Sequence, residues 1–546
     1  MKVSEAIART LVREGVEVVF SLLGDTNMDV VAKLAELGVP VHESRHEATA
    51  FAMADGYSRA SGKLVVCSVT AGPGFAHTFV PMMSAAEREP SRVILLTGPH
   101  SRDDLHHRQH LDHEGLARLA RTEYQPLASP GAAVDRTQAV VDRVRSNGRP
   151  VVFDVPFDVQ SQEFPWDVPD ESRPTPGWEL PQRMHPDPEA VTRAAELIKQ
   201  AERPVVLAGG GAKHALEPMV ALARATGALL ATSINARGLF HGDDFNAGNA
   251  GLFAWKSSAE LFAEADLVVA FGASLNGHTT EGGYIFPMAD VIQVDTKEPG
   301  PMQSDENARC YVRGDAEVVA AQLVEATSGD PVNEGFRTTK TLERLRSPVD
   351  ETDFPIAEGE IDPRALCERL DELLPEDCGF VSGAAHYWSF PQLHMPRYRD
   401  PLVYSNYFGS IGYSVSVGLG VALGANKPVV VFEGDGGFLL NPHAIETAAR
   451  TGARVLVMVM NDQALGAEYH KLAAKGLDAS LAAHPLVDIA NIASEFGCSS
   501  HRLTDLDQLP AMVGEFAAGE GPMLIDVRIS RSVVSQPYRR LHFGQE

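Results

Sequence analysis

The sequence has little of what marks secreted, membrane-spanning or nucleic-acid-binding proteins. Its five cysteines show neither metal-ligand spacing nor a pairing pattern, which indicates a reducing compartment. No apolar run is long enough to span a membrane, and the chain opens with an amphipathic helix pattern (Val3, Ile7, Leu11) rather than a signal peptide. Acidic residues (73) outnumber basic ones (47), and the net charge of −26 argues against nucleic acid or an anionic membrane as partner. We therefore expect a cytoplasmic globular protein.

The chain is too long, at 546 residues, for a single hydrophobic core. Two segments without periodicity, 160–188 and 328–360, are rich in proline or in charge and are predicted to be linkers. They divide the chain into predicted domains of 1–160, 190–328 and 360–530. Each domain alternates short apolar runs with helical patterns. This alternation predicts an α/β protein of three similar, doubly wound parallel-sheet domains.

The strand candidates are short apolar runs. They are Val16–Phe20, Leu64–Cys67 and Val93–Leu96 in the first third, Pro204–Leu207, Leu267–Ala270 and Val291–Val294 in the second, and Phe380–Val381, Val429–Phe432, Val455–Met460 and Met523–Val527 in the last.

The strongest local signal lies between two of these strands in the last third. Gly434-Asp435-Gly436-Gly437 follows the first strand, a helix pattern spans Phe438–Arg450, and Asn461-Asp462-Gln463 follows the second strand. A right-handed crossover would bring both strand ends to one sheet edge, so Asp435 and Asn461 are predicted neighbours. Their oxygens suit Mg²⁺, and the glycines let backbone N–H groups approach a phosphate. A lone Gly-Asp-Gly is also common in ordinary acidic turns, so other segments must decide its meaning.

Two motifs of the first third bear on this question. Glu47, in Arg45-His46-Glu47-Ala48, begins a pattern of small residues that can pack closely against another helix. A glutamate in a first helical turn is also favoured by the helix dipole alone. The turn Gly72-Pro73-Gly74 follows a predicted strand and would bring backbone close to a ligand, although many such turns bind nothing.

Taken together, these motifs resemble those of the thiamine-diphosphate enzymes of the pyruvate oxidase, pyruvate decarboxylase and acetolactate synthase group. The order is the same: Arg-His-Glu-Ala with Asp55-Gly56-Tyr57-Ser58-Arg59, then Ala-Gly-Pro-Gly, then Gly-Asp-Gly, then Asn461. The resemblance covers about residues 1–530. It implies a pyrimidine-binding domain, a central domain and a diphosphate-binding domain, in that order.

The resemblance also implies how the cofactor would be held. Glu47 would hydrogen-bond the aminopyrimidine ring and promote removal of the thiazolium C2 proton. The metal ligands for Mg²⁺ would be Asp435, Asn461 and the backbone carbonyl of Gln463. The residues expected to bind the cofactor are Glu47, Gly72, Pro73, His386, Ser410, Ile411, Gly434, Asp435, Gly436, Gly437, Asn461, Gln463, Leu465 and Gly466. Ser382 stands where relatives carry an Asp, which weakens the transfer to His386. Ile411 would separate the two rings, although periodicity alone reads it as a core residue.

The residues that would select the reaction give conflicting indications. Asp25 resembles an active-site acid of pyruvate decarboxylases, whereas Gln109 and the segment Asn461–Gly466 resemble acetolactate synthases. His278 falls near a catalytic His of benzoylformate decarboxylases, where acetolactate synthases carry an Arg. His77 replaces a commoner Asn, as in some 2-hydroxyacyl-CoA lyases, and Glu468 is one position from the decarboxylase Glu. The catalytic candidates are therefore Glu47, Asp25, His77, Gln109, His278 and Glu468.

The expected function is decarboxylation of a small 2-oxo acid followed by carboligation, as in acetolactate synthases. A simple 2-oxo-acid decarboxylase and a 2-hydroxyacyl-CoA lyase are the alternatives, and a silent cofactor-binding scaffold is disfavoured because Glu47 and the metal ligands are present. The segment Gly209–His214 lacks the spacing of a dinucleotide motif, so FAD or ADP in the central domain is not predicted. The resemblance implies a homodimer or homotetramer whose active site spans the subunit interface.

Overall fold

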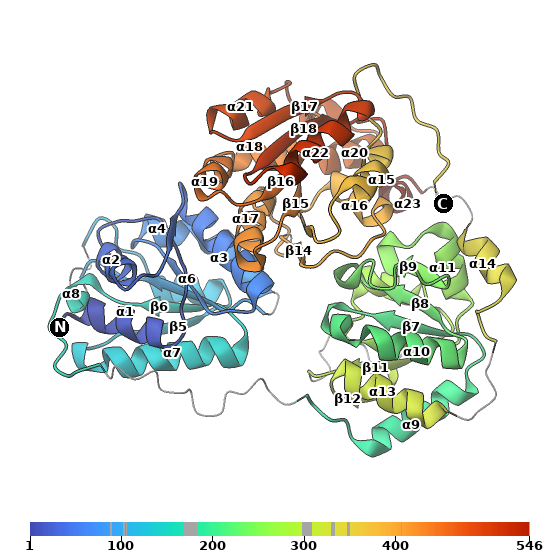
Figure 1. The fold of residues 1–546 in the computed structure, drawn as a ribbon, viewed down its shortest axis with the longest axis horizontal. Helices are drawn as coiled ribbons and strands as arrows, with labels where there is room; N and C mark the ends of the chain where they lie inside the picture. Colours follow the sequence, from blue (N-terminus) through green and yellow to red (C-terminus); the bar gives the residue numbers. More distant parts are fainter. Residues whose placement is uncertain are drawn as a thin grey trace.

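The computed structural model describes residues 1–87, 90–101, 104, 106–168, 183–297, 308–328, 334–346, 350–405 and 407–544. These residues form three six-stranded sheets, each built from one third of the chain (Figure 1). Neighbouring strands are parallel in all three sheets. The predicted fold class, three doubly wound α/β units, is confirmed. We call them the N-terminal, central and C-terminal units; the exact domain limits stay a prediction.

The N-terminal unit contains the first sheet. Its strands are β1 Val19–Ser21, β2 Val41–Glu43, β3 Val65–Ser68, β4 Val93–Thr97, β5 Glu123–Pro126 and β6 Val151–Asp154. Its helices are α1 Val3–Arg13, α2 Met28–Glu36, α3 Glu47–Ser61, α4 Pro73–His77, α5 Phe79–Ala86, α6 His113–Leu119, α7 Ala133–Asn147 and α8 Phe157–Gln160. The inner strands β1, β3, β4 and β6 are buried on both faces, as expected for a parallel sheet covered by helices, whereas the edge strands β2 and β5 are only partly buried.

The central unit contains the second sheet. Its strands are β7 Pro204–Ala208, β8 Leu229–Thr232, β9 Asn246–Asn249, β10 Leu267–Phe271, β11 Asp290–Asp295 and β12 Ala308–Arg313. Its helices are α9 Pro188–Gln200, α10 Leu216–Thr226, α11 Lys256–Ala263, α12 Gly277–Thr280, α13 Ala316–Thr327 and α14 Thr339–Leu345.

The C-terminal unit contains the third sheet. Its strands are β13 Gly379–Ser382, β14 Leu402–Tyr404, β15 Val429–Gly434, β16 Val455–Asn461, β17 Ser499–Leu503 and β18 Met523–Arg528. Its helices are α15 Pro363–Leu373, α16 Ser389–His394, α17 Ser414–Ala425, α18 Asp435–Leu440, α19 Ala444–Thr451, α20 Gly466–Ala474, α21 Ile489–Glu495, α22 Leu509–Ala518 and α23 Gln536–Phe543.

Strand order separates the central unit from the other two. The N-terminal sheet runs β2-β1-β3-β4-β6-β5, and the C-terminal sheet runs β14-β13-β15-β16-β18-β17, which is the same topology. The central sheet runs β12-β11-β10-β7-β8-β9. The expectation of three similar units therefore holds for the outer two and is wrong for the strand order of the central one.

The helix predicted over Phe438–Arg450 is wrong as a single element. The chain forms α18 and α19 instead, with Asn441, Pro442 and His443 between them. Proline lacks the N–H that a helix interior needs, so the helix stops and restarts there. The predicted stop at Gly452 is confirmed, because this residue caps α19 in the left-handed conformation (φ 65°).

The N-terminal and C-terminal units are joined by close contact between α3 and α17, which lie side by side in Figure 1. A Cβ atom on Gly420 would lie 1.9 Å from the carbonyl oxygen of Met53, and one on Gly56 would lie 2.2 Å from that of Val417. Only glycine allows this approach of two backbones. The close helix packing predicted from the small residues of α3 is therefore present.

The two predicted linkers differ from simple connections where they are described. Residues 169–182 of the first lie outside the described residues, whereas Glu163 bridges to Lys2 and Phe164 packs into the N-terminal core. The second contains α14, which packs against α11, and the buried Phe336. Among the described residues, no helix is long and apolar enough to cross a membrane.

Candidate active site

A cavity of about 380 Å³ opens at the carboxyl edge of the C-terminal sheet. It lies where β13 and β15 end, at the point where the strand order reverses, which is the usual ligand position in open α/β sheets. Its walls come from three places. The sheet edge supplies residues 384–389, Gly409, Ile411, residues 433–437, Met460, Asp462, residues 464–468 and Lys471, the central unit supplies Leu252, Phe253 and His278, and α23 supplies Pro537, Tyr538, Leu541 and His542.

Asp435 is the first residue of α18 and lines this cavity. The side chain is buried, and its carboxylate accepts N–H groups from Gly436 (2.8 Å) and Gln463 (2.9 Å). Burial raises the pKa of Asp435 to about 6, although the nearby His484 ring, 3.4 Å away, opposes the shift. A buried carboxylate in such surroundings favours a bound cation.

Asn461 lies beside Asp435, because the register pairs Gly434 with Met460 at the ends of β15 and β16. Its amide nitrogen donates to the Asp526 carboxylate (2.8 Å), which leaves the amide oxygen to face a ligand. Gln463 has a left-handed backbone (φ 57°), an unusual conformation for a residue with a side chain. Its carbonyl oxygen accepts the backbone N–H of His484 (2.9 Å) and a longer hydrogen bond from the Arg531 guanidinium (3.5 Å). The predicted metal ligands are thus brought together.

Glycines form the floor of the cavity beside these ligands. A Cβ atom on Gly437 would lie 2.3 Å from the Glu433 carboxylate, one on Gly436 2.8 Å from Leu465, and one on Gly434 3.0 Å from the Tyr387 ring. Backbone N–H groups can therefore approach a ligand that larger residues would exclude. Ile411 also lines the cavity, and the nearby Ser410 hydroxyl oxygen is buried without a partner among the described residues.

His386 and Gly466 line the same cavity. The His386 ring is buried, and its Nε2 accepts the N–H of Ser535 (3.0 Å), the residue that precedes α23. Burial, together with the neighbouring His470, holds the pKa of His386 well below its usual value. The ring is therefore neutral and serves as an acceptor.

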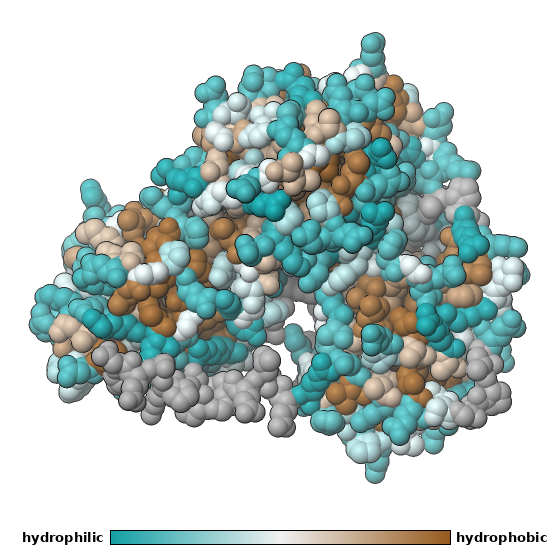
Figure 2. All heavy atoms as spheres, viewed as in Figure 1, coloured by the Kyte–Doolittle hydropathy of each residue, from teal (hydrophilic) through white to brown (hydrophobic). Residues whose placement is uncertain are grey.

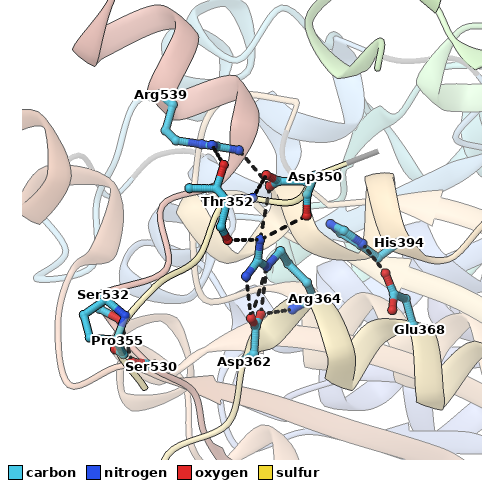
Figure 3. A network of polar contacts seen from close by, with 10 residues as sticks. All are labelled: Asp350, Thr352, Pro355, Asp362, Arg364, Glu368, His394, Ser530, Ser532 and Arg539. Carbon is cyan, nitrogen blue, oxygen red and sulfur yellow. Dashed lines mark hydrogen bonds and ion pairs between the residues drawn. The ribbon is translucent and has the colours of Figure 1, made fainter. Parts of the chain in front are cut away.

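The C-terminal helix is a wall that sequence reasoning missed. The Tyr538 ring packs edge-on against His386, with the ring centres 4.8 Å apart. Figure 3 shows how the helix is tied down: Arg539 donates to Asp350 (2.7 Å) and Thr352. Arg364 in turn bonds Asp362 and Thr352. Residues 350–364 therefore hold α23 against the C-terminal unit, and we call this segment the strap. No periodic pattern in the sequence predicts it.

His278 lines the cavity from the central unit, and Glu468 lines it from α20. Both side chains are exposed to solvent. Glu468 also lies 3.4 Å from Lys471, another lining residue. The structure therefore brings these two catalytic candidates to the predicted metal site.

Glu47 lies in a second place, at the first turn of α3. Its carboxylate bonds the His77 ring (2.9 Å), and His46 stacks on His77 with the ring centres 4.7 Å apart. One ligand atom from each of these three residues lies within 4.8 Å of the others, so they could also hold a metal ion. Burial and the neighbouring His77 lower the pKa of His46.

The other N-terminal candidates surround this glutamate at the carboxyl edge of the first sheet. A Cβ atom on Gly74 would lie 3.3 Å from the Glu47 carboxylate, and one on Gly72 would lie 2.4 Å from the Gln109 carbonyl oxygen. Pro73 begins α4 between these two glycines. The loop of Asp25 packs through Gly24 against Thr70, while Asp25 itself is exposed.

Within one chain the two groups of candidates are not brought together. Among the described residues, none from 1–160 lines the cavity. Asp435 begins α18 at the cavity, whereas residues just after this helix meet the surroundings of Glu47: Thr49 donates to Asn441 (3.2 Å) and His46 stacks on His443 (5.5 Å). The cavity and Glu47 thus lie at opposite ends of α18.

Fold and cavity define an α/β protein with a ligand site at a sheet edge, and comparison with known proteins makes the class specific. Family models match the N-terminal TPP-binding domain of thiamine pyrophosphate enzymes (residues 1–118), the central domain (191–323) and the C-terminal TPP-binding domain (381–527). This chain belongs to the thiamine pyrophosphate enzyme family.

Among curated relatives, a probable 2-ketoarginine decarboxylase of Pseudomonas aeruginosa is 30% identical over 96% of this chain and 93% of the relative. A probable acetolactate synthase large subunit of Methanocaldococcus jannaschii is 27% identical over 97% of this chain and 92% of the relative. An acetolactate synthase of Mycobacterium bovis is 25% identical over 96% and 87%.

Proposed function

We propose that this chain is a thiamine-diphosphate- and Mg²⁺-dependent decarboxylase of a 2-oxo acid that releases the aldehyde. One observation carries the proposal: Asp435, the first residue after β15, shares a cavity with His278 and Glu468, and the backbone N–H of Gln463, just after β16, donates to its carboxylate. The carboxylate suits a metal–diphosphate ligand, and the other two side chains can supply protons beside it.

The residues fit the cofactor at its diphosphate end. Asp435, Asn461 and the Gln463 carbonyl would bind Mg²⁺, and the glycine floor would receive the phosphate oxygens. When bound, thiamine diphosphate supplies a nucleophilic carbon and accepts the electron pair left by decarboxylation. Ser410 and His386 would orient it, and Ile411 would pack against its rings.

The pyrimidine end requires Glu47, which lies away from this cavity. We propose that a second copy of the chain supplies it, so that each site combines the cavity of one chain with Glu47, Gly72, Pro73 and Gln109 of the other. Exposed apolar side chains support a pairing surface: Leu23 and Met28 on the N-terminal unit, and Leu440, Leu477 and Leu481 on the C-terminal unit. Figure 2 shows hydrophobic residues gathered on the N-terminal unit around α2, α4 and α6.

The identity of residue 278 favours aldehyde release. A histidine titrates near neutral pH and can protonate a carbon centre beside it, whereas an arginine would hold a second anionic substrate. Glu468 would protonate or position the substrate from α20. Asp25 and His77, if they face the cavity of a second chain, would add further acid groups. The relative named 2-ketoarginine decarboxylase supports the same reaction class.

Carboligation is the second candidate. It is supported by the relatives named acetolactate synthase and by the resemblance of Asn461–Gly466 to their motif. FAD or ADP is not part of either proposal. We place the protein in the cytoplasm on the basis of its five free, buried cysteines.

Product analysis tests the proposal. The protein loaded with Mg²⁺ and thiamine diphosphate is incubated with pyruvate, 2-oxobutyrate, benzoylformate and 2-ketoarginine, and the products are identified by NMR. An aldehyde with one equivalent of CO₂ supports decarboxylation alone, and an acyloin or acetohydroxy acid supports carboligation. Glu47→Gln should abolish exchange of the cofactor C2 proton while leaving cofactor binding within about threefold. Normal exchange in that variant would exclude the role given to Glu47.

A further inference from the structure

Two walls of the cavity come from elements that are far apart in the sequence, and an arginine of one wall bonds to the other. Arg540, on α23, donates to the Glu281 carboxylate and to the carbonyl oxygen of Leu252 (3.4 Å). Leu252 lines the cavity, and Glu281 directly follows α12, which carries His278. Both charged side chains are about three-quarters buried, at 26% and 27% exposed, so solvent screens their attraction only in part.

The segments that form the central-unit wall pack directly against one another. A Cβ atom on Gly251 would lie 2.0 Å from the His278 carbonyl oxygen, so the backbone before Leu252 packs directly on α12. Phe253 meets Trp388 of the C-terminal unit edge-on, with the ring centres 4.9 Å apart. The wall is therefore held at two points, an aromatic contact on one side and the Arg540 contacts on the other.

The backbone at Glu281 shows that this contact offsets a cost. Glu281 has a left-handed conformation (φ 50°, ψ 42°), which is unfavourable for a residue with a Cβ. Leu275, before α12, is also left-handed (φ 50°), and Gly282 and Gly283 continue the turn. A glycine at 281 would adopt this conformation freely, but it could not pair with Arg540.

We propose that Arg540 and Glu281 are positioning residues that fix His278 over the substrate end of the cavity. The ion pair closes the contact between α23 and the loop of residues 275–283, so it is one of the contacts that set the distance between the two walls. The inference rests on the proposed function of the cavity, because it assigns His278 the role of facing the substrate.

The neighbouring Arg539 provides a matched control. It lies on the same helix and is also paired with a carboxylate, but its partners Asp350 and Thr352 belong to the strap of the C-terminal unit. Arg539→Gln should therefore lower the melting temperature without changing the central wall. Arg540→Gln and Glu281→Gly should change the wall, and Glu281→Gly also removes the backbone cost, so it should fold normally.

Steady-state kinetics on the loaded enzyme give the first test. In Arg540→Gln and Glu281→Gly we expect KM for the 2-oxo acid to rise about tenfold, with cofactor affinity within about threefold of wild type. Arg539→Gln should change KM less than about threefold. If Arg540 acts through His278, combining Arg540→Gln with His278→Gln should be no worse than His278→Gln alone. Unchanged KM in both folded variants, or full additivity with His278→Gln, would overturn the proposal.

Hydrogen exchange separates failure of this proposal from failure of the proposed function. If the wild-type protein turns over none of the 2-oxo acids, the proposed function fails. Amide hydrogen exchange then still tests whether Arg540 holds the loop that carries His278. Residues 274–284 should exchange at least about tenfold faster in Arg540→Gln than in wild type or Arg539→Gln, because the contact that holds the loop is lost. Equal protection in all three proteins would show that Arg540 does not hold this loop.

Discussion

The two outer units share one strand order, yet their sheet edges carry different chemistry. At the C-terminal edge the candidate ligands are buried oxygens from Asp435, Asn461 and a backbone carbonyl, set among glycines. At the N-terminal edge Glu47 is surrounded by the imidazoles of His46 and His77. On the proposed function, one edge would hold a charged group in place and the other would exchange a proton. One topology would then serve two tasks, because the loops that leave the strands determine the chemistry.

The largest expected effect tests the C-terminal sheet edge as the site that holds the metal. Asp435→Asn keeps the shape of the side chain but removes its charge. We expect cofactor affinity to fall roughly 100-fold or more, because the metal loses an anionic ligand. Quenching of tryptophan fluorescence, with Trp388 in the cavity wall, measures binding, and a chelator should reproduce the loss in wild type. Asp507→Asn, an exposed carboxylate of the same unit, is the control. Unchanged affinity in Asp435→Asn would remove the metal site from the cavity.

Mixing two inactive variants tests whether the two edges meet between chains. Glu47→Gln and Asp435→Asn are co-expressed with different tags and the mixed species is compared with each parent. If each site takes its two halves from different chains, random pairing should restore about a quarter of wild-type activity, since half of the dimers then hold one intact site. If the mixture stays inactive although mixed dimers form, the two halves do not meet across chains.

A moderate effect is expected in the pH dependence of the free energy of unfolding, which tests the burial of His470 in the C-terminal unit. Burial, together with Arg531, lowers the pKa of His470 behind the cavity to about 4. The unfolded histidine, with a pKa near 6.5, binds more protons than the folded one, so stability is complete above about pH 6.5 and falls toward pH 4, by up to about 1.4 kcal/mol per pH unit.

His470→Gln should therefore flatten the pH dependence. Between pH 7 and pH 5 we expect its free energy of unfolding to fall by roughly 1–2 kcal/mol less than that of wild type, as measured by urea denaturation. His501→Gln, beside Glu515 in the same unit, serves as the comparison variant. Equal slopes for wild type and His470→Gln would show that this ring is not held neutral by burial.

The smallest effect is expected where the two units meet at the surface. Arg45 pairs with Glu446 across the boundary at 2.9 Å, and its side chain is 46% exposed. Arg45→Gln should lower the melting temperature only slightly, and salt should reduce even that change, because the ion pair is exposed. Thermal unfolding at low and high salt measures it. A large loss of stability would mean that the charged pair, rather than the α3–α17 contact, joins the units.

The sequence alone was enough to predict features that leave a local pattern in the chain. The apolar runs coincide with strands to within a few residues, and Asp435 follows β15 as the pattern predicted, because buried strands and glycine-rich turns leave a direct mark in composition. The break at Pro442 could have been read from the proline itself. The roles of the candidate residues stay predictions, and the structure adds which of them share a cavity.

Other features could not be read from the sequence because they join distant segments. Arg540 meets Glu281 and Arg539 meets Asp350, and neither pair has a spacing that a periodicity search detects. Glu433 lies within the buried strand β15, where the sequence pattern indicated only apolar packing. Its pKa is raised by burial although it accepts N–H groups from Ser414 and Gly434. These contacts depend on the tertiary fold.

The backbone contact between α3 and α17 has a mechanical consequence. With Gly420 and Gly56 pressed against carbonyl groups of the facing helix, neither position has room for a side chain, so replacing either glycine would force the two helices apart. The cavity walls supplied by the central unit and α23 lie outside this contact, so their sequence can change without disturbing the junction of the outer units.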